Sequence, residues 1–247
     1  MSEAPQQHLV TRFEKELVQL RDLLIEMGGN VESQLALAAR AIIERDTEAA
    51  TRAVESDPEV DKLGERIEEQ VIRMLALRQP MAEDLRTIVG ALRIMVDLER
   101  IGDYAANVAK RSIVLAQFSL PFSLAGIANM ARLVQEEVKD VIDAIGDRDP
   151  NKAVRVWRSD QAVDDLYTSI FRELVTYMME DPRNITPCTH LLFIAKNLER
   201  IGDHATNVAE TVHYAITGQV LTEARPKGDN SPYAIVRPRT EEEEEEE

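Results

Sequence analysis

Apolar residues recur every three or four positions through most of this sequence, which is the spacing of one face of an α-helix. Proline, glycine and polar pairs interrupt the spacing, notably at Gln79-Pro80 and at Asp181-Pro182. Across Gly28-Gly29 the period continues, so that stretch is either one long helix or two collinear ones. The pattern predicts an all-α protein with helices near residues 8–45, 47–54, 58–78, 81–118, 123–145, 150–157, 160–180 and 187–217. Ser159-Asp160 is expected to cap the helix that runs to residue 180.

Two stretches one hundred residues apart are nearly identical. Leu98–Ala109 and Leu198–Ala209 share ten of twelve residues. A weaker correspondence, at an offset of 103, relates Ser56–Asp61 to Ser159–Asp164. An internal repeat joined by short connections predicts two pseudo-symmetric antiparallel three-helix bundles. We expect the first at residues 8–119 and the second at residues 122–220.

Each repeated stretch carries an acidic stripe opposite its apolar face. A Glu and an Asp four residues apart on a helix repel each other by roughly 0.2–0.5 kcal/mol unless a cation or a basic partner offsets them. Arg100 and Arg200 are the local candidates for that role, and a bound metal is the other. Gly102 and Gly202 lie between the two faces, where each costs about 1 kcal/mol relative to alanine. This repeated cost suggests that another group approaches the backbone there.

The acidic pairs of each half are expected to converge on adjacent antiparallel helices. Carboxylate and amide oxygens suit magnesium, calcium or manganese, and clustered carboxylates also bridge iron or zinc. The sequence therefore predicts sites for divalent or trivalent metal ions. The plainer interpretation is that each stripe is a solvated helix face. Repetition in both halves favours a site, whose candidate ligands are Asp57, Asp61, Glu99, Asp103, Asn107, Asp160, Asp164, Glu199, Asp203 and Asn207.

Composition and charge narrow the class of protein. Apolar residues make up 44% of the chain and aromatic residues 4%, which is typical of helical bundles. The net charge of −16 argues against a nucleic-acid ligand. The single cysteine, Cys188, cannot form an internal disulfide, and neither a signal peptide nor a membrane-spanning stretch is evident. We expect a soluble cytoplasmic protein with a disordered acidic tail at 222–247 that ends in seven glutamates.

Catalytic motifs are poorly represented, so we predict no catalytic residues, no organic cofactor and no enzyme. The alternative is a carboxylate-bridged metalloenzyme of the ferritin-like class, which needs a Glu-x-x-His motif on two helices. Glu210 and His213 supply that motif once, but Lys110 and Ile113 stand at the equivalent positions of the first half. The alternative is therefore the weaker hypothesis.

Several motifs together resemble the PhoU family of phosphate-specific transport system accessory proteins. They are the paired Leu-Glu-Arg-Ile-Gly-Asp stretches, Met27-Gly28-Gly29, Arg78-Gln79-Pro80 with Asp84-Leu85-Arg86, and the segment Tyr177–Arg183. The resemblance covers approximately residues 8–220 and leaves out the tail.

The resemblance implies a fold and a function beyond what the residues alone indicate. It implies two symmetric three-helix bundles that hold metal clusters on Glu/Asp-x-x-x-Asp motifs, here Glu99/Asp103 and Glu199/Asp203 and more loosely Asp57/Asp61 and Asp160/Asp164. It also implies a negative regulator of the phosphate-starvation (Pho) response and of phosphate uptake. The implied partners are the ATPase subunit of the phosphate ABC transporter, a PhoR-type sensor histidine kinase and a second copy in a homodimer. The protein would reach the membrane only through those partners.

Overall fold

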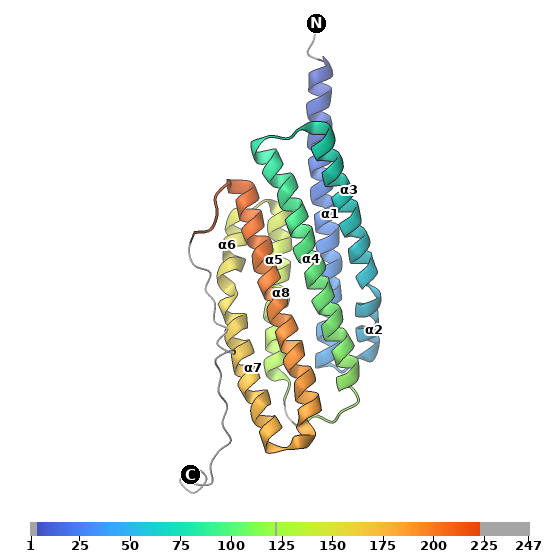
Figure 1. Ribbon diagram of the computed structural model, residues 1–247, viewed down its shortest axis with the longest axis vertical. Coiled ribbons are helices and arrows are strands. Elements are labelled where there is room, and N and C mark those ends of the chain that lie inside the picture. Colours follow the sequence, from blue (N-terminus) through green and yellow to red (C-terminus); the bar gives the residue numbers. More distant parts are fainter. Residues whose placement is uncertain (1–3, 122, 223–247) are drawn as a thin grey trace.

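The computed structural model describes residues 4–121 and 123–222, and the regular structure of these residues is entirely helical (Figure 1). Their elements are α1 (Ala4–Ile43), α2 (Thr47–Glu55), α3 (Asp57–Arg78), α4 (Ala82–Leu115), α5 (Ala125–Asp147), α6 (Pro150–Ser159), α7 (Gln161–Glu180), the 3₁₀ turn η1 (Pro182–Asn184) and α8 (Ile185–Thr217). The all-α prediction is confirmed, and the helix limits follow the apolar period to within a few residues.

Helix α1 passes without interruption through Gly28-Gly29. A Cβ at Gly28 would lie 2.8 Å from the Cγ1 atom of Ile142 on α5, whereas a Cβ at Gly29 would meet nothing within 4 Å. The first glycine therefore permits close packing of α1 against α5. Of the two arrangements that the sequence left open, one long helix or two collinear ones, the structure has the single long helix.

The same capping device begins the short helix of each half. The side chain of Asp46 accepts hydrogen bonds from the backbone N–H groups of Glu48 and Ala49 at the start of α2. Asp149 does the same at the start of α6, where Pro150 occupies the first helical position. The offset of 103 between the two caps extends the duplication beyond the motifs that revealed it.

Two predicted helix starts need correction. Asp160 lies at the start of α7 as predicted, but its backbone is helical and its side chain makes no capping hydrogen bond. Its carboxylate instead accepts from the Thr206 hydroxyl on α8. Helix α8 begins at Ile185 and not at Pro187, because η1 brings the chain into helical conformation two residues earlier.

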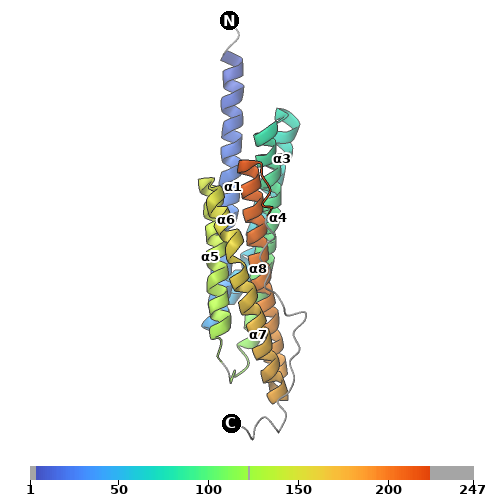
Figure 2. The same ribbon diagram turned by 90° about the vertical axis from the view of Figure 1, so that its left-hand side faces the viewer.

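The two halves pack into one elongated body (Figures 1 and 2). In the first half, α1 lies against α2, α3 and α4, and in the second half α8 lies against α5, α6 and α7. The most extensive packing joins α4 to α8, and α1 also packs on α5. Buried residues of both halves consequently form one hydrophobic core, and α1 extends past the neighbouring helices at one end.

The limits of 8–119 and 122–220 for the halves stay a prediction, since one core joins the two. The predicted tail lies outside the described residues from position 223 onward. Among the described helices, none is long and apolar enough to span a lipid bilayer.

Candidate metal centres

Gly102 on α4 lets a side chain of α1 approach the helix backbone. A Cβ at this position would lie 3.0 Å from the Oε1 atom of Gln34 and 3.7 Å from the Oδ1 atom of Asp57. Gln34 is fully buried, and its Nε2 group donates to Asp57 Oδ1 at 2.9 Å and to the Ala53 carbonyl at 3.0 Å. Its Oε1 atom is buried without a hydrogen-bond partner. The prediction that another group approaches Gly102 is confirmed.

The carboxylates of the first half influence one another electrostatically. Burial raises the pKa of Glu99, and the nearby carboxylates of Asp61 and Asp103 raise it further. Burial also raises the pKa of Asp61, with additional contributions from Asp57 and Asp103. The acidic pairs of α3 and α4 therefore converge as the spacing predicts. We call Asp57, Asp61, Glu99 and Asp103 the first acidic cluster.

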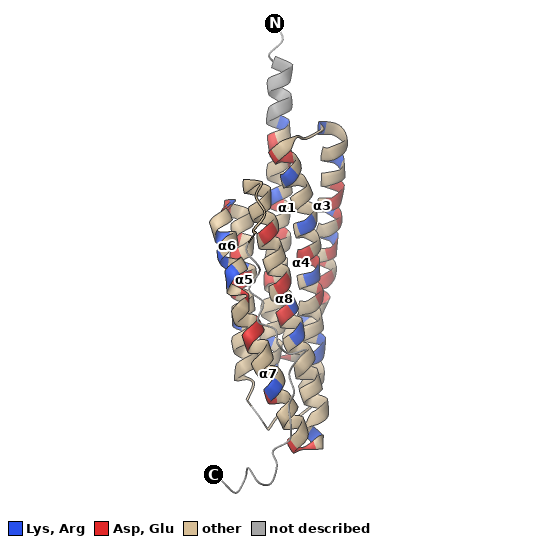
Figure 3. Cartoon of the chain, turned by 60° about the vertical axis from the view of Figure 1, so that its left-hand side comes forward, with Lys and Arg blue, Asp and Glu red and all other residues tan. Residues whose placement is uncertain are grey.

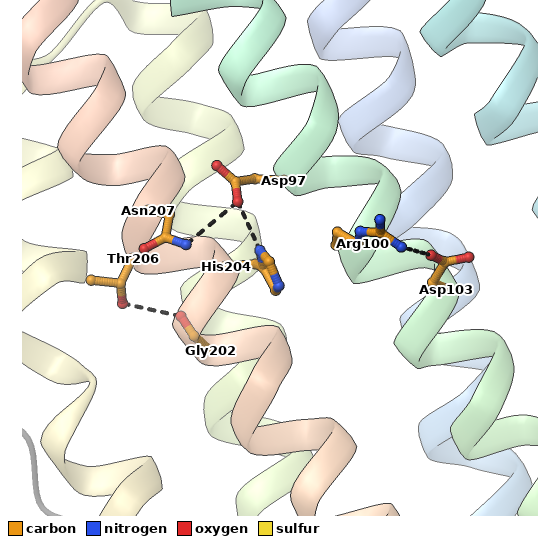
Figure 4. Close-up of polar contacts among 7 residues, drawn as sticks. All are labelled: Asp97, Arg100, Asp103, Gly202, His204, Thr206 and Asn207. Carbon is orange, nitrogen blue, oxygen red and sulfur yellow. Dashed lines mark hydrogen bonds and ion pairs between the residues drawn. The ribbon is translucent and has the colours of Figure 1, made fainter.

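An arginine contacts one edge of the first acidic cluster. The Nη1 atom of Arg100 lies 3.1 Å from Asp103 Oδ2, and both side chains are largely open to solvent (Figure 4). Arg100 is therefore a basic partner of Asp103, as the sequence suggested. Acidic and basic positions are interspersed along the neighbouring surfaces of α3 and α4 (Figure 3).

The second half places a carboxylate where the first half has an amide. Glu137 on α5 stands 103 residues after Gln34 and accepts a hydrogen bond from Ser159 Oγ at 2.9 Å. A Cβ at Gly202 would lie 3.2 Å from Glu137 Oε2 and 3.6 Å from Asp160 Oδ1. These two acidic side chains therefore converge above the glycine. We call Glu137, Asp160, Asp164, Glu199 and Asp203 the second acidic cluster.

Burial is much deeper in the second acidic cluster. Among the described residues, the buried carboxylates are Glu137, Asp160, Asp164 and Glu199, with exposed fractions of 5%, 2%, 4% and 5%. All four belong to this cluster. In the first acidic cluster, by contrast, solvent reaches the carboxylates, and the side chain of Asp103 is 42% exposed.

Glu199 has two differently placed oxygens. Its Oε1 atom lies 2.7 Å from the Nζ atom of Lys196, while its Oε2 atom is buried without a hydrogen-bond partner. Burial raises the pKa of Glu199, the ammonium of Lys196 lowers it, and the carboxylates of Asp203 and Asp164 raise it again. The net direction is upward, so the fold disfavours the charged form of this side chain.

The oxygen atoms of both clusters suit a hard cation. In each half, one buried side-chain oxygen near the carboxylates has no hydrogen-bond partner: Oε1 of Gln34 in the first half and Oε2 of Glu199 in the second. As the side chains stand in residues 4–121 and 123–222, no three His, Cys, Asp or Glu are grouped closely enough to hold a metal ion. Coordination would thus require side-chain rotation within each cluster.

The two asparagines of the candidate set lie apart from these contacts. Asn107 is exposed. The Asn207 amide donates to Asp97 Oδ1 on α4 at 3.5 Å, and His204 Nδ1 lies 2.7 Å from the same oxygen (Figure 4). Asp97, His204 and Asn207 therefore connect the two halves, which the acidic-stripe pattern did not predict.

Sequence reasoning also missed Gln34, Glu137 and Lys196. The offset of 103 that relates α3 to α7 also relates α1 to α5, and it places Glu137 opposite Gln34 in the repeat. This correspondence could have identified both residues from the sequence. Lys196 gave no such signal, because its counterpart in the first half is Val96.

Comparison with known proteins bears on the identity of the chain. The PhoU domain matches residues 24–112 and 127–212. The phosphate-specific transport system accessory protein PhoU homolog of Rhizobium meliloti (strain 1021) is 48% identical over 223 residues, which cover 90% of this chain and 94% of that protein. The homolog of Caulobacter vibrioides (strain NA1000 / CB15N) is 49% identical over 224 residues, covering 90% of this chain and 97% of that protein.

Two solved PhoU structures have the same fold as this chain. The crystal structure of PhoU from Pseudomonas aeruginosa has a TM-score of 0.82 and 40% identity, and the match covers 84% of this chain and all of that one. The phosphate transport system regulatory protein PhoU from Streptococcus pneumoniae gives a TM-score of 0.78 at 27% identity, over 85% of this chain and 100% of that one. These names describe accessory and regulatory proteins and not enzymes. With both of its repeats matched and nearly half of its residues shared with such relatives, the chain belongs to the PhoU family.

Proposed function

We propose that this protein is a negative regulator of the phosphate-starvation response and of phosphate uptake, acting as an adaptor. The carrying observation is the 48% identity, across 90% of the chain, to a protein named for phosphate-specific transport. Its partners are the ATPase subunit of the phosphate ABC transporter and a PhoR-type sensor histidine kinase. It works in the cytoplasm as a homodimer and reaches the membrane only through its partners.

The physical properties of the chain favour regulation by docking over direct sensing of phosphate. A net charge of −16 opposes the binding of a free anion. Long exposed helix faces are available to other proteins instead. In this proposal the conformation of the transporter decides which partner surface is presented, and the adaptor binds one state better than the other.

The proposal includes cation binding at the two acidic clusters. Asp57, Asp61, Glu99 and Asp103 would hold an ion in the first half, and Asp160, Asp164, Glu199 and Asp203 would hold one in the second. Iron, zinc, manganese and magnesium are the candidate metals. A bound cation would neutralise carboxylates that face one another across neighbouring helices, and so would stabilise their packing.

The ferritin-like metalloenzyme remains a second candidate, but its motif residues have other contacts. Glu210 Oε1 accepts a hydrogen bond from Trp157 Nε1 at 2.9 Å, and His213 Nδ1 lies 3.0 Å from the Gln219 carbonyl oxygen. Neither contact joins the pair to the acidic clusters. This arrangement favours the adaptor.

Deletion of the gene separates the two candidates. A promoter of a phosphate-starvation gene fused to a reporter should become active in phosphate-rich medium, and the intact gene supplied on a plasmid should silence it again. A reporter that stays silent in the deletion strain, accompanied by loss of an oxidase activity, would overturn the adaptor and support the metalloenzyme.

A further inference from the structure

We propose that the acidic end of this chain, Glu241–Glu247, binds a row of four arginines along the contact between α4 and α8. We call this row the arginine seam, and its members are Arg86, Arg93, Arg111 and Arg200. The contact is made within one chain, and it covers this surface against other acidic segments. The inference is independent of the proposed function, because neither the acidic clusters nor a partner protein enters it.

Contacts between α4 and α8 define the two ends of the arginine seam. At the end where α8 stops, the Cζ atom of Arg86 lies 3.2 Å from the position that a Cβ of Gly218 would take. At the other end, Arg111 of α4 lies over the ring of Phe193 of α8, with its Cζ atom 4.1 Å from the ring centroid. The seam between these contacts is about 37 Å long, since each helical residue of α4 rises by about 1.5 Å. It follows the face of the molecule that Figure 1 shows, where α4 and α8 lie side by side.

The other two arginines lie between these ends. Arg93 follows Arg86 by nearly two full helical turns, so both lie on the same side of α4. Arg200 reaches across from α8, and its Cζ atom lies 5.5 Å from the ring centroid of Tyr104 on α4. The side chains of Arg93 and Arg200 are both exposed. The four guanidinium groups therefore form one row that solvent and other segments can reach.

The positive charge of the arginine seam is not neutralised locally. None of the four guanidinium groups forms an ion pair with a carboxylate in the part of the chain that the structure describes. The buried Nε atom of Arg86 has no hydrogen-bond partner there either. Asp97 lies within the seam, but its Oδ1 atom already contacts His204 and Asn207. Guanidinium groups bind carboxylates well, so such a row favours an acidic occupant.

The acidic end of the same chain is within reach of the arginine seam. Gly218, the first residue after α8, lies beside Arg86, so the chain leaves the helix at one end of the seam. Residues 223–240 lie between the described part of the chain and the glutamates, and an extended segment of that length spans at most about 60 Å. This reach exceeds the length of the seam.

The run of glutamates is the part of the tail whose charge matches the seam. Residues 223–240 carry charges of both signs, whereas Glu241–Glu247 are all acidic. One exposed ion pair contributes little by itself. A tethered segment, however, is presented at an effective concentration on the order of millimolar, so several weak pairs suffice to hold it. Salt should release the contact, because the Debye length falls from about 10 Å at 0.1 M to about 3 Å at 1 M.

A competition experiment on the full-length chain tests the proposal. The probe is a fluorescein-labelled peptide of seven glutamates, followed by fluorescence anisotropy at about 50 mM salt. A tail variant, in which Glu241–Glu247 are all changed to glutamine, should bind the peptide at least about tenfold more tightly than wild type, because its own tail no longer competes. At about 0.5 M salt neither protein should bind the peptide.

A matched pair of double substitutions separates the seam from general charge. In the tail variant, Arg93→Gln with Arg200→Gln should weaken peptide binding by about tenfold or more. Arg155→Gln with Arg172→Gln removes the same charge from exposed arginines of α6 and α7 that also lack an ion pair, and it should change binding little. Circular dichroism and the melting temperature of each variant show that the fold is kept.

Chemical crosslinking identifies which chain supplies the glutamates. Carbodiimide joins a lysine amine to a carboxylate that it contacts, so Arg93→Lys in the otherwise wild-type chain should crosslink to Glu241–Glu247, and Arg155→Lys should not. A mixture of ¹⁴N- and ¹⁵N-labelled protein should give crosslinks within one label only. Crosslinks between the labels would assign the tail to a second copy and overturn the intramolecular contact.

The peptide experiments can also overturn the inference. The contrary results are equal affinity of wild type and the tail variant, no peptide binding by either protein, and equal losses from the seam pair and the control pair. Each would show that the four arginines do not recognise the acidic end of the chain.

Discussion

His204 on α8 and Asp97 on α4 lie 2.7 Å apart, measured from Nδ1 to Oδ1, at the contact between the two halves of the molecule. The repeat does not duplicate this pair, because Asn197 and Tyr104 stand at the equivalent positions. Tyr104 instead packs its ring 5.6 Å from the imidazole of His204, measured between ring centroids. The pair thus joins two halves that are otherwise held together mainly by apolar packing.

We expect Asp97 and His204 to be energetically coupled. Asp97→Asn and His204→Gln should each destabilise the fold, and the double variant should lose less than the sum of the two, with a coupling free energy of about 1 kcal/mol. Urea denaturation of the four proteins in the cycle measures this. Strictly additive losses would show that the contact contributes nothing of its own. Arg100→Gln, which removes an exposed ion pair, should change stability little and serves as the control.

Adjacent glycines of α1 should respond oppositely to the same substitution. Gly28→Ala places a Cβ 2.8 Å from Ile142 and should destabilise the fold by about 1–3 kcal/mol, because the core side chain must move. Gly29→Ala meets nothing within 4 Å and should stabilise the helix by up to about 1 kcal/mol. Thermal and urea unfolding of both variants supply the comparison. Equal effects at the two positions would argue against close packing of α1 on α5.

Glu16 should make the stability of the fold depend on pH in the acidic range. Two hydrogen bonds from Arg78, at 2.7 and 2.8 Å, hold the pKa of Glu16 below its ordinary value of 4.5. Because the folded pKa is depressed, the contribution to stability is complete above the unfolded pKa and is lost as pH falls through the folded one. Glu16→Gln should therefore be less stable than wild type at pH 7, and the difference should shrink below about pH 4.5. A difference that stays constant from pH 7 to pH 3 would assign the effect to packing and not to charge.

The order and type of the helices could be predicted because they depend on local features. Apolar spacing, the Asp149-Pro150 start and the Gln79-Pro80 stop each act within a few residues. The capping role expected of Asp160 failed because a distant hydroxyl, that of Thr206, binds its carboxylate. The packing of α7 against α8 therefore decides the contacts of this side chain, and its local preference for capping does not.

Only the part of the candidate site that lies in the recognisable repeats could be predicted from the sequence. The pairs on α3 and α4 converge as expected, since antiparallel neighbours must bring equivalent faces together. Gln34 and Glu137 escaped notice because each is a single polar residue within an apolar helix face, and only the folded structure shows them beside Gly102 and Gly202. The difference in burial between the two clusters was likewise beyond reach, because it depends on how all the helices pack.

Direct binding to the phosphate transporter tests the central claim of this account. Purified full-length protein, with and without added Mn²⁺, would be titrated into the isolated ATPase subunit of the phosphate ABC transporter and followed by calorimetry. An adaptor predicts a saturable one-to-one complex per protomer in at least one of the two metal states. Folded protein that shows no heat of binding in either state, and does not co-elute with the ATPase subunit on gel filtration, would contradict it.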